Sequence, residues 1–359
     1  MDKLQTNTTI ISKALCVDDG KKLWRWYRDS LSGFCDKDNQ DKQYQHDVEV
    51  VKGNKKETIR VSILKLENIG PNMAIDEKQI GEEMHTVLSN RDTGKIAMLA
   101  KTLAVDGLLK AISGIGDKAD LVETITRDMS PAYAKFCDKA FPNASQIADK
   151  FHIIMNLLDA CQAVRVRYRQ EALREKRLKY EEHKKQEKQR QKHCVENRKP
   201  YTKKNFTYKE TILGNGDTVM EALARSRYLL FKFRSDWTLS QERRAKALFE
   251  IFPEIEKVYD LACEFRNWMK KSNVGMDMAT LRNRLRQWDK KVEQAEIEEM
   301  LNFKSMIERN KLVVLNYFRF GATNAIAENI NGRIQRFVMI NQGTRDREFF
   351  YFRLANYFS

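Results

Sequence analysis

Residues 151–204 constrain the possible folds more than any other part of this sequence. Up to Pro200 the run contains no Gly and no Pro, and it becomes steadily more polar along its length. Gly and Pro are the residues that most often interrupt helices. The run therefore predicts one long helix that begins near Phe151. Only five prolines occur among the 359 residues, so we expect helix to dominate the rest of the chain as well.

The same run holds most of the excess positive charge. Residues 165–204 contain sixteen Lys and Arg but only six Glu, and the whole chain has a formal net charge of +15. Pairs such as Glu175–Lys179 are typical of a solvated helix. A surplus of ten positive charges exceeds what such pairs neutralise, so the segment is predicted to lie along the phosphates of nucleic acid. An anionic membrane surface is the second candidate for a basic chain.

Residues 60–160 have a different pattern, which predicts a sheet. Short β-type runs are separated first by turn residues and then by helical stretches. The expected strands are 60–66, 72–75, 84–89, 96–101, 121–126 and 145–148, and the expected helices are 105–112 and 131–141. Three strands joined by hairpins, followed by alternating helix and strand, favour a mixed sheet covered by helices.

Residues 7–30 predict two short helices separated by a break, the second of them basic. Leu23, Trp26 and Tyr27 fall on one face of that second helix at helical spacing. This is the outline of a helix-turn-helix, and any small helical hairpin is an equal alternative. Residues 36–59 are polar and charge-mixed and are predicted to be a linker.

Composition excludes several classes of protein. The chain has no apolar run long enough to span a membrane and no apolar N-terminal leader, so we expect neither a membrane span nor secretion. Its six cysteines are scattered, without the spacing of a zinc finger. Reduced thiols in the cytoplasm are therefore favoured over disulfides or structural zinc.

Two aspartates stand where apolar runs stop. Asp76 follows the run that ends at Ile75, and Asp128 comes shortly before a helix that Pro131 begins. In an open α/β sheet, sites form at the ends of strands. A turn or N-cap role is the common alternative for Asp128.

A predicted helix over 321–337 supplies a third carboxylate, Glu328. Projection of this helix places Glu328 on the face opposite an apolar stripe. The stripe consists of Ile326, Ile330, Ile334 and Phe337, and the face of Glu328 also carries Asn324, Asn331, Gly332 and Gln335. Carboxylates that converge repel one another unless a cation neutralises them. Asp76, Asp128 and Glu328 together could hold two Mg²⁺ ions through oxygen ligands.

Five short stretches carry a resemblance to a known family. They are Ile-Asp-Glu-Lys at 75–78, Asp-Met-Ser-Pro-Ala-Tyr at 128–133, Phe-Pro-Asn-Ala at 141–144, Asp-Lys-Phe-His at 149–152 and Asn-Ala-Ile-Ala-Glu-Asn-Ile-Asn at 324–331. In this order they resemble the DDE transposases of bacterial insertion sequences, and most closely the ISL-three family, over about residues 60–359. The resemblance implies a mixed α/β fold: a ribonuclease-H-like catalytic core with a large all-helical insertion and a small N-terminal helix-turn-helix-like segment.

The resemblance also implies roles for individual residues. Asp76, Asp128 and Glu328 match the catalytic, metal-binding triad, and Asp149 with His152 matches a D-x-x-H element. For this pair we favour a structural Asp–His contact that positions the core helix over metal ligation. The further residues expected to support the site are Asn324 and Asn331.

The implied organisation divides the chain into five segments. They are a helix-turn-helix-like segment at 1–35, the linker at 36–59, the first part of the core at 60–160, a basic helical insertion at 161–310, and the C-terminal part of the core at 311–359. The residues predicted to contact DNA are Lys21, Lys22, Arg25, Arg28, Arg165, Arg167, Arg169, Arg174, Lys176, Arg177, Arg333 and Arg336.

The activity that the resemblance implies is Mg²⁺-dependent cleavage of DNA at insertion-sequence ends, followed by transfer of the 3′-OH into target DNA. Two Mg²⁺ ions, which Mn²⁺ can replace, would be the cofactors. Double-stranded DNA would be the partner, bound by a homodimer or higher oligomer in the bacterial cytoplasm, associated with the nucleoid. Two alternatives remain from the residues alone: a catalytically inactive or repurposed DNA-binding protein of transposase descent, and a metal-dependent nuclease without strand transfer.

Overall fold

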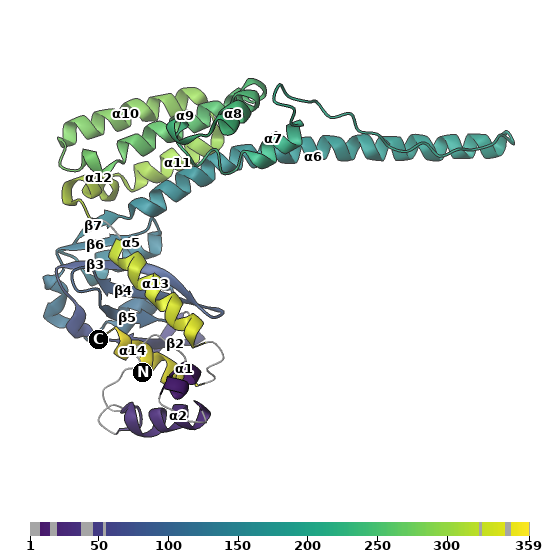
Figure 1. Ribbon diagram of the computed structural model, residues 1–359. Coiled ribbons are helices and arrows are strands. Elements are labelled where there is room, and N and C mark those ends of the chain that lie inside the picture. Colours follow the sequence, from purple (N-terminus) through teal and green to yellow (C-terminus); the bar gives the residue numbers. More distant parts are fainter. Residues whose placement is uncertain are drawn as a thin grey trace. The chain divides into compact units, whose positions relative to one another are not determined.

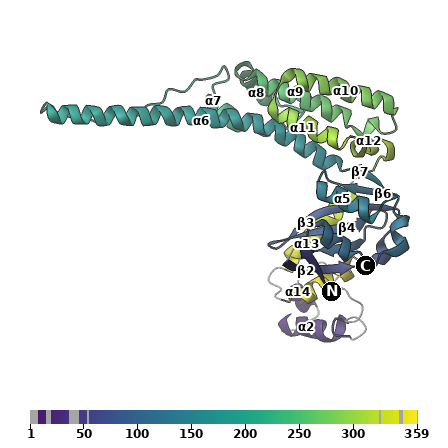
Figure 2. The same cartoon turned by 180° about the vertical axis from the view of Figure 1, so that it is seen from behind.

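A computed structural model describes residues 8–14, 20–36, 46–52, 55–322, 325–341 and 346–358. The chain divides into two compact units, which Figures 1 and 2 show from opposite sides. Unit 1 comprises Met1–Ile153 and Asn310–Ser359, and unit 2 comprises Ile154–Arg309.

Unit 1 is built on a seven-stranded mixed sheet in the order β1-β2-β5-β4-β3-β6-β7. The first five strands in this order form antiparallel pairs, whereas β6 and β7 run parallel to β3. The strands are β1 His46–Lys52, β2 Lys55–Leu64, β3 Asn72–Ile80, β4 Glu83–Asn90, β5 Ile96–Ala100, β6 Thr124–Arg127 and β7 Ser145–Ala148. The mixed α/β prediction is thus confirmed, and the sheet is compatible with a ribonuclease-H-like core.

Helices cover both faces of this sheet (Figure 1). Alternate residues of β3 point to opposite faces, so Met73 and Ile75 enter one core and Ile80 enters the other. The first core is completed by α4 Val105–Ala111 and α5 Pro131–Ala140, and the second by α13 Ala325–Ile340 and α14 Arg347–Tyr357. Asp76, an even position like Ile80, therefore faces α13.

The prediction of a linker is wrong for part of residues 36–59. Residues 46–52 and 55–59, expected to lie in the linker, form β1 and the first half of β2, the two strands at one edge of the sheet. Val48 and Val50 alternate with polar residues, and this period of two is the pattern of a strand. Val50 is buried, while the charged residues between keep the edge polar, which is why the segment resembled a linker.

The N-terminal segment contains α1 Thr8–Ala14, α2 Gly20–Trp26 and a π-helical turn, Tyr27–Leu31. Of the three residues expected on one face, Leu23 and Tyr27 are buried, whereas Trp26 is 56% exposed and does not belong to the packed face. The N-terminal segment packs against α14, where Phe349 contacts Trp24, Tyr27 and Phe34. Whether the two helices act as a helix-turn-helix stays a prediction.

Unit 2 is helical. The predicted long helix is confirmed over Lys150–Glu196 as α6, whose first residues belong to unit 1. Residues 199–204 of the predicted run are not helical. The other helices of unit 2 are α7 Val219–Arg225, α8 Leu239–Ile251, α9 Pro253–Trp268, α10 Met278–Ala295 and α11 Glu298–Arg309, and α12 Lys311–Phe320 belongs to unit 1. Short 3-10 helices lie at Leu66–Asn68, Gly116–Leu121, Arg234–Asp236 and Lys271–Asn273. Among the helices the structure describes, none combines the length and apolar character needed to cross a membrane.

Candidate active site

Sheet register brings the two predicted aspartates together. In the parallel pair β3–β6, Asn72 lies opposite Thr124 and Ala74 opposite Thr126. The same offset places Asp76 opposite Asp128, the residue directly after β6. Residues opposite each other on neighbouring strands are nearest neighbours across the ladder. The sheet thus juxtaposes two carboxylates that are far apart in the sequence.

A third aspartate continues the row. Arg127 lies opposite Ala148 in the pair β6–β7, so Asp149 follows β7 at the level of Asp128. The ladder extends to this position because the Asp149 N–H donates to the Arg127 carbonyl at 2.8 Å. Three neighbouring parallel strands therefore present an aspartate at one level.

The sequence predicted that Asp76 lies at the end of its strand, and this prediction is wrong. β3 continues to Ile80 because its second half pairs with β4 in a hairpin that closes at Ile80 and Glu83. The strands that end at this level are the neighbours β6 and β7. The carboxylates thus gather at a step in the sheet rather than at a straight edge.

The Asp76 side chain is held on both oxygens and is 16% exposed. Oδ1 accepts from the Glu77 N–H at 2.8 Å, and Oδ2 accepts from Asn331 Nδ2 of α13 at 2.6 Å. The Asn331 Oδ1 is buried and has no hydrogen-bond partner in the described part of the chain. A buried polar oxygen of the residue that bonds with Asp76 is thereby left open to a further donor or cation.

Glu328 lies on the same helix, one turn before Asn331, and is exposed. Within the described ranges, no three or more His, Cys, Asp and Glu side chains are grouped so as to hold a metal ion. The structure therefore ties α13 to Asp76 but does not gather Glu328 with the two aspartates. Asn324 lies outside the described residues.

The prediction of the apolar stripe of α13 is confirmed in part. Ile330, Ile334 and Phe337 are buried, whereas Ile326 is 39% exposed and lies outside the core. Ala327 is buried in its neighbourhood instead. The buried stripe of α13 thus runs through Ala327, Ile330, Ile334 and Phe337, and Asn331, next to this stripe, bonds with Asp76.

His152 links two of the aspartates. Its Nε2 lies 3.6 Å from Asp76 Oδ1 and 3.6 Å from Asp149 Oδ2. Asp149 is buried, and its Oδ1 accepts from the Phe151 N–H at 2.9 Å at the start of α6. The Asp149–His152 pair thus fixes the first turn of α6 and also reaches Asp76, a contact that the local spacing did not reveal.

The electrostatics reflect this crowding. Burial raises the pKa of Asp128, and the charge of Asp76 raises it further, while the Ser130 N–H and His152 oppose the change. Burial also raises the pKa of Glu77, with the charges of Asp128 and Asp76 as further causes. Contact with the Asp76 carboxylate raises the pKa of His152 to about 9, and the charges of Asp149 and Asp128 act in the same direction. His152 is therefore a cation at neutral pH.

Sequence reasoning missed Arg127. Its side chain is 2% exposed and donates to the Asp128 carbonyl at 2.7 Å and to Gln146 Oε1 at 2.6 Å. These bonds position the backbone at Asp128. Arg127 directly follows the predicted strand 121–126, and an arginine at the end of a buried strand needs buried partners.

The cations predicted to contact DNA fall into two groups. The Arg165 guanidinium is buried and donates to the Leu223 carbonyl at 2.7 Å, so a phosphate contact through Arg165 is wrong for this structure. Arg167 pairs with Glu254 and with Glu299 at 3.0 Å. These two arginines are occupied because they lie where α6 packs against the other helices of unit 2.

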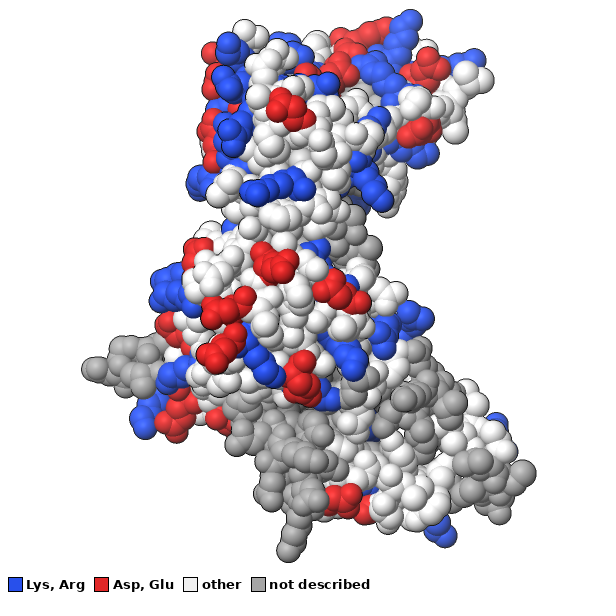
Figure 3. Space-filling model, turned by 90° about the vertical axis from the view of Figure 1, so that its left-hand side faces the viewer, with Lys and Arg blue, Asp and Glu red and all other residues white. Residues whose placement is uncertain are grey.

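The remaining cations are more open to solvent. Those that are exposed are Lys21, Lys22, Arg25, Arg174, Arg177 and Arg336. Those with a partner or partial burial are Arg28 beside Asp346, Lys176 beside Glu210, Arg333 over Tyr357, and the half-buried Arg169. On the face displayed in Figure 3, basic and acidic side chains are interspersed. Contact with DNA stays a prediction for all of these residues.

The family model for DDE transposases of the ISL-three type, described as "Transposase", matches residues 73–354. No curated protein and no solved structure matched the chain. The matched range begins in β3, ends in α14, and includes Asp76, Asp128 and Glu328. Because it covers more than half of the chain, the protein belongs to the ISL-three family of DDE transposases.

Proposed function

We propose that this transposase cleaves DNA phosphodiesters at the ends of its insertion sequence and joins the freed 3′-OH to target DNA, with Asp76, Asp128 and Glu328 holding two Mg²⁺ ions. Mn²⁺ is expected to replace Mg²⁺. The observation that carries the proposal is the register of β3 and β6, whose offset, continued two residues beyond the pair of Ala74 and Thr126, aligns Asp76 with Asp128.

The donor set fits a hard cation. Carboxylate and amide oxygens are the ligands that Mg²⁺ prefers, and Asp76, Asp128 and the unpartnered Asn331 Oδ1 supply them. Burial and the charge of Asp76 raise the pKa of Asp128, which means that these surroundings stabilise its ionised form less than water does. A divalent ion would remove this penalty.

The residues of the chain would position the reacting groups. When bound, a pair of such ions activates the attacking oxygen and stabilises the leaving oxygen of a phosphodiester. Asn331 orients Asp76, and Arg127 holds the backbone of Asp128. His152 neutralises part of the negative charge at Asp76 and Asp149.

Glu328 would complete the site. It lies one helical turn from Asn331, whose bond to Asp76 fixes α13 against the sheet. We expect metal and DNA to draw Glu328 toward the aspartates, because three carboxylates converge favourably only around a cation.

The test is a strand-transfer assay with duplexes that carry the ends of the element. Joined products that require Mg²⁺ or Mn²⁺ would support the proposal. Cleavage without joining would identify a nuclease, and DNA binding without cleavage would identify an inactive descendant of a transposase.

A second readout locates the metal independently of activity. Fe²⁺ in place of Mg²⁺, with ascorbate and peroxide, should cut the polypeptide near the ends of β3 and β6. Asp76→Asn should abolish these cuts, whereas Asp47→Asn, on the exposed edge strand β1, should not. Cuts that persist in Asp76→Asn would remove Asp76 from the site.

A further inference from the structure

Unit 2 carries a second feature, outside the carboxylate site. After α6 the chain turns back and runs beside that helix (Figures 1 and 2). We call residues 199–212 the return segment. Phe206 packs against Tyr180, with 5.3 Å between ring centroids, and against His183 at 5.5 Å. Tyr208 lies nearer the start of α6, beneath Lys176 and Lys179. The return segment is therefore antiparallel to α6.

The start of the return segment is fixed by a buried carboxylate of α6. The Glu187 side chain is 10% exposed and pairs with Arg190 at 2.6 Å. Its Oε1 accepts from Tyr201 OH at 2.9 Å and from the Lys204 N–H at 2.8 Å. A buried carboxylate with three donors resists separation from them, so this end of the segment stays on the helix.

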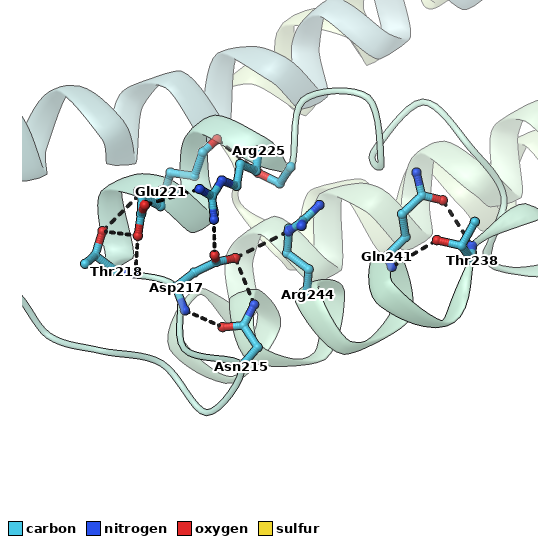
Figure 4. A network of polar contacts seen from close by, with 10 residues as sticks. Asn215, Asp217, Thr218, Glu221, Arg225, Thr238, Gln241 and Arg244 are labelled. Atoms are coloured by element: carbon cyan, nitrogen blue, oxygen red, sulfur yellow. Dashed lines mark hydrogen bonds and ion pairs between the residues drawn. The ribbon is translucent and has the colours of Figure 1, made fainter.

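The far end of the return segment is fixed by a polar network (Figure 4). Ile212 pairs with Thr218 across a tight turn. In that turn, Asp217 bonds with Arg225 of α7 and, at 3.3 Å, with Arg244 of α8. Thr218 also begins α7 with a capping box. Both ends are thus tied, and the space between the return segment and α6 is preformed.

This space is a groove of about 630 Å³, which we call the arm groove. Four lysines line it: Lys184 and Lys188 from α6, and Lys203 and Lys204 from the return segment. Tyr180 and Phe206 form its aromatic wall, and Tyr180 is 47% exposed. The carboxylate of Glu187, which also lines the groove, is already committed to its three donors.

We propose that the arm groove binds a single strand of DNA, with phosphates on the lysines and a base stacked on Tyr180. Lysines interleaved with accessible aromatic rings are the composition of single-strand sites, because unpaired bases expose a π-face. A surface that contacts only duplex phosphates needs charge but no rings. A groove fixed at both ends also loses little conformational entropy on binding. The choice of DNA as the ligand rests on the proposed function, and the chemistry of the groove does not.

The test measures binding of a fluorescent oligothymidylate of roughly twelve nucleotides, and of a duplex of equal length, to the full chain in EDTA. Tyr180→Leu keeps an apolar contact with Phe206 but removes the stacking ring. We expect it to weaken single-strand binding by about 5- to 150-fold and to leave duplex binding near wild type. Tyr180→Trp should retain or strengthen single-strand binding, which a merely misfolded groove would not allow.

The charge contribution is tested separately. Replacing Lys184 and Lys188 with Gln should reduce the salt dependence of single-strand binding by about 0.7 per lost contact. Matched controls outside the groove are Tyr228→Leu, at a ring that is 67% exposed, and Lys246→Gln with Lys290→Gln. These controls should behave as wild type.

Two results would overturn the proposal. The first is a single-strand affinity of Tyr180→Leu equal to that of the wild type. The second is an equal loss of single-strand and duplex binding in Tyr180→Leu, together with a similar loss in Tyr180→Trp. The assay contains no divalent metal, so Glu328→Gln should bind the oligothymidylate like wild type. A chain that binds single strands but never cleaves DNA would contradict only the proposed catalysis.

Discussion

At the scale of single residues, His152 offsets part of the negative charge of two site carboxylates. Its ring lies between Asp76 and Asp149, each 3.6 Å away. Contact with the Asp76 carboxylate raises the pKa of His152 to about 9, above the value of about 6.5 for an unperturbed histidine. Protonation of the His152 ring therefore stabilises the folded state relative to the unfolded state.

This shift predicts a pH dependence of stability in EDTA. A histidine whose pKa is raised by folding contributes stability that is complete below pH about 6.5 and is lost as the pH rises through about 9. The difference in Tm between wild type and His152→Gln should therefore shrink between these pH values. A difference that stays constant from pH 6 to 10 would contradict the ion pair.

Sequence could indicate the site carboxylates but not their connections. Asp76 and Asp128 were chosen because apolar runs end beside them, and sheet register does bring them together. The contact of His152 with Asp76 joins residues far apart in the chain, and the local Asp149–His152 spacing carries no information about it. The bonds of Arg127 were missed for the same reason, since its partners depend on strand pairing.

At the scale of elements, α6 separates structural arginines from those available to DNA. Arg165→Gln should lower the free energy of unfolding by about 1–3 kcal/mol, because it leaves the Leu223 carbonyl without its buried donor. Arg174→Gln with Arg177→Gln should leave stability unchanged. The double variant should instead weaken binding to every duplex alike and reduce the salt slope by about 0.9 per lost contact. An unchanged slope would make this part of α6 a solvated helix.

The aromatic contact of the N-terminal segment with α14 predicts a second effect. Phe349 is fully buried and contacts Trp24, Tyr27 and Phe34. Phe349→Ala should cost about 3–5 kcal/mol through the cavity it creates and should expose residues 20–36 to protease. Met339→Ala, at a side chain that is 58% exposed, is the control. Equal protease resistance in both variants would show that the N-terminal segment is held elsewhere.

Element types were predictable where the periodicity was strong. The central strands and α5 were found because apolar alternation and Pro131 mark them clearly, and β7 was predicted with the bounds Ser145–Ala148 that the structure has. β1 was missed because edge strands often carry charged residues, which prevent pairing with other chains. The exposure of Trp26 and Ile326 depends on which residues other elements cover, and a helical projection alone does not contain that information.

At the scale of the whole molecule, the chain divides into two compact units. In unit 2, Trp288 is 3% exposed and packs on Phe265 and Phe303. Trp288→Ala should remove about 3–5 kcal/mol from unit 2 and lower one calorimetric transition while leaving the other in place. Phe136→Ala, in the core of unit 1, should affect the complementary transition. A single transition that moves with both variants would show that the units unfold together.

We propose that this transposase catalyses strand transfer through Asp76, Asp128 and Glu328, and the strand-transfer activity of Glu328→Gln is the decisive measurement. The substitution keeps the size of an exposed side chain but removes its charge, so folding and metal-free DNA binding should match wild type. Cleavage and joining should fall by a factor on the order of a hundred or more, because a metal supplies several kcal/mol of transition-state stabilisation. Gln335→Ala, exposed on the same helix, should retain activity. Wild-type cleavage and joining by Glu328→Gln would contradict a catalytic role of Glu328.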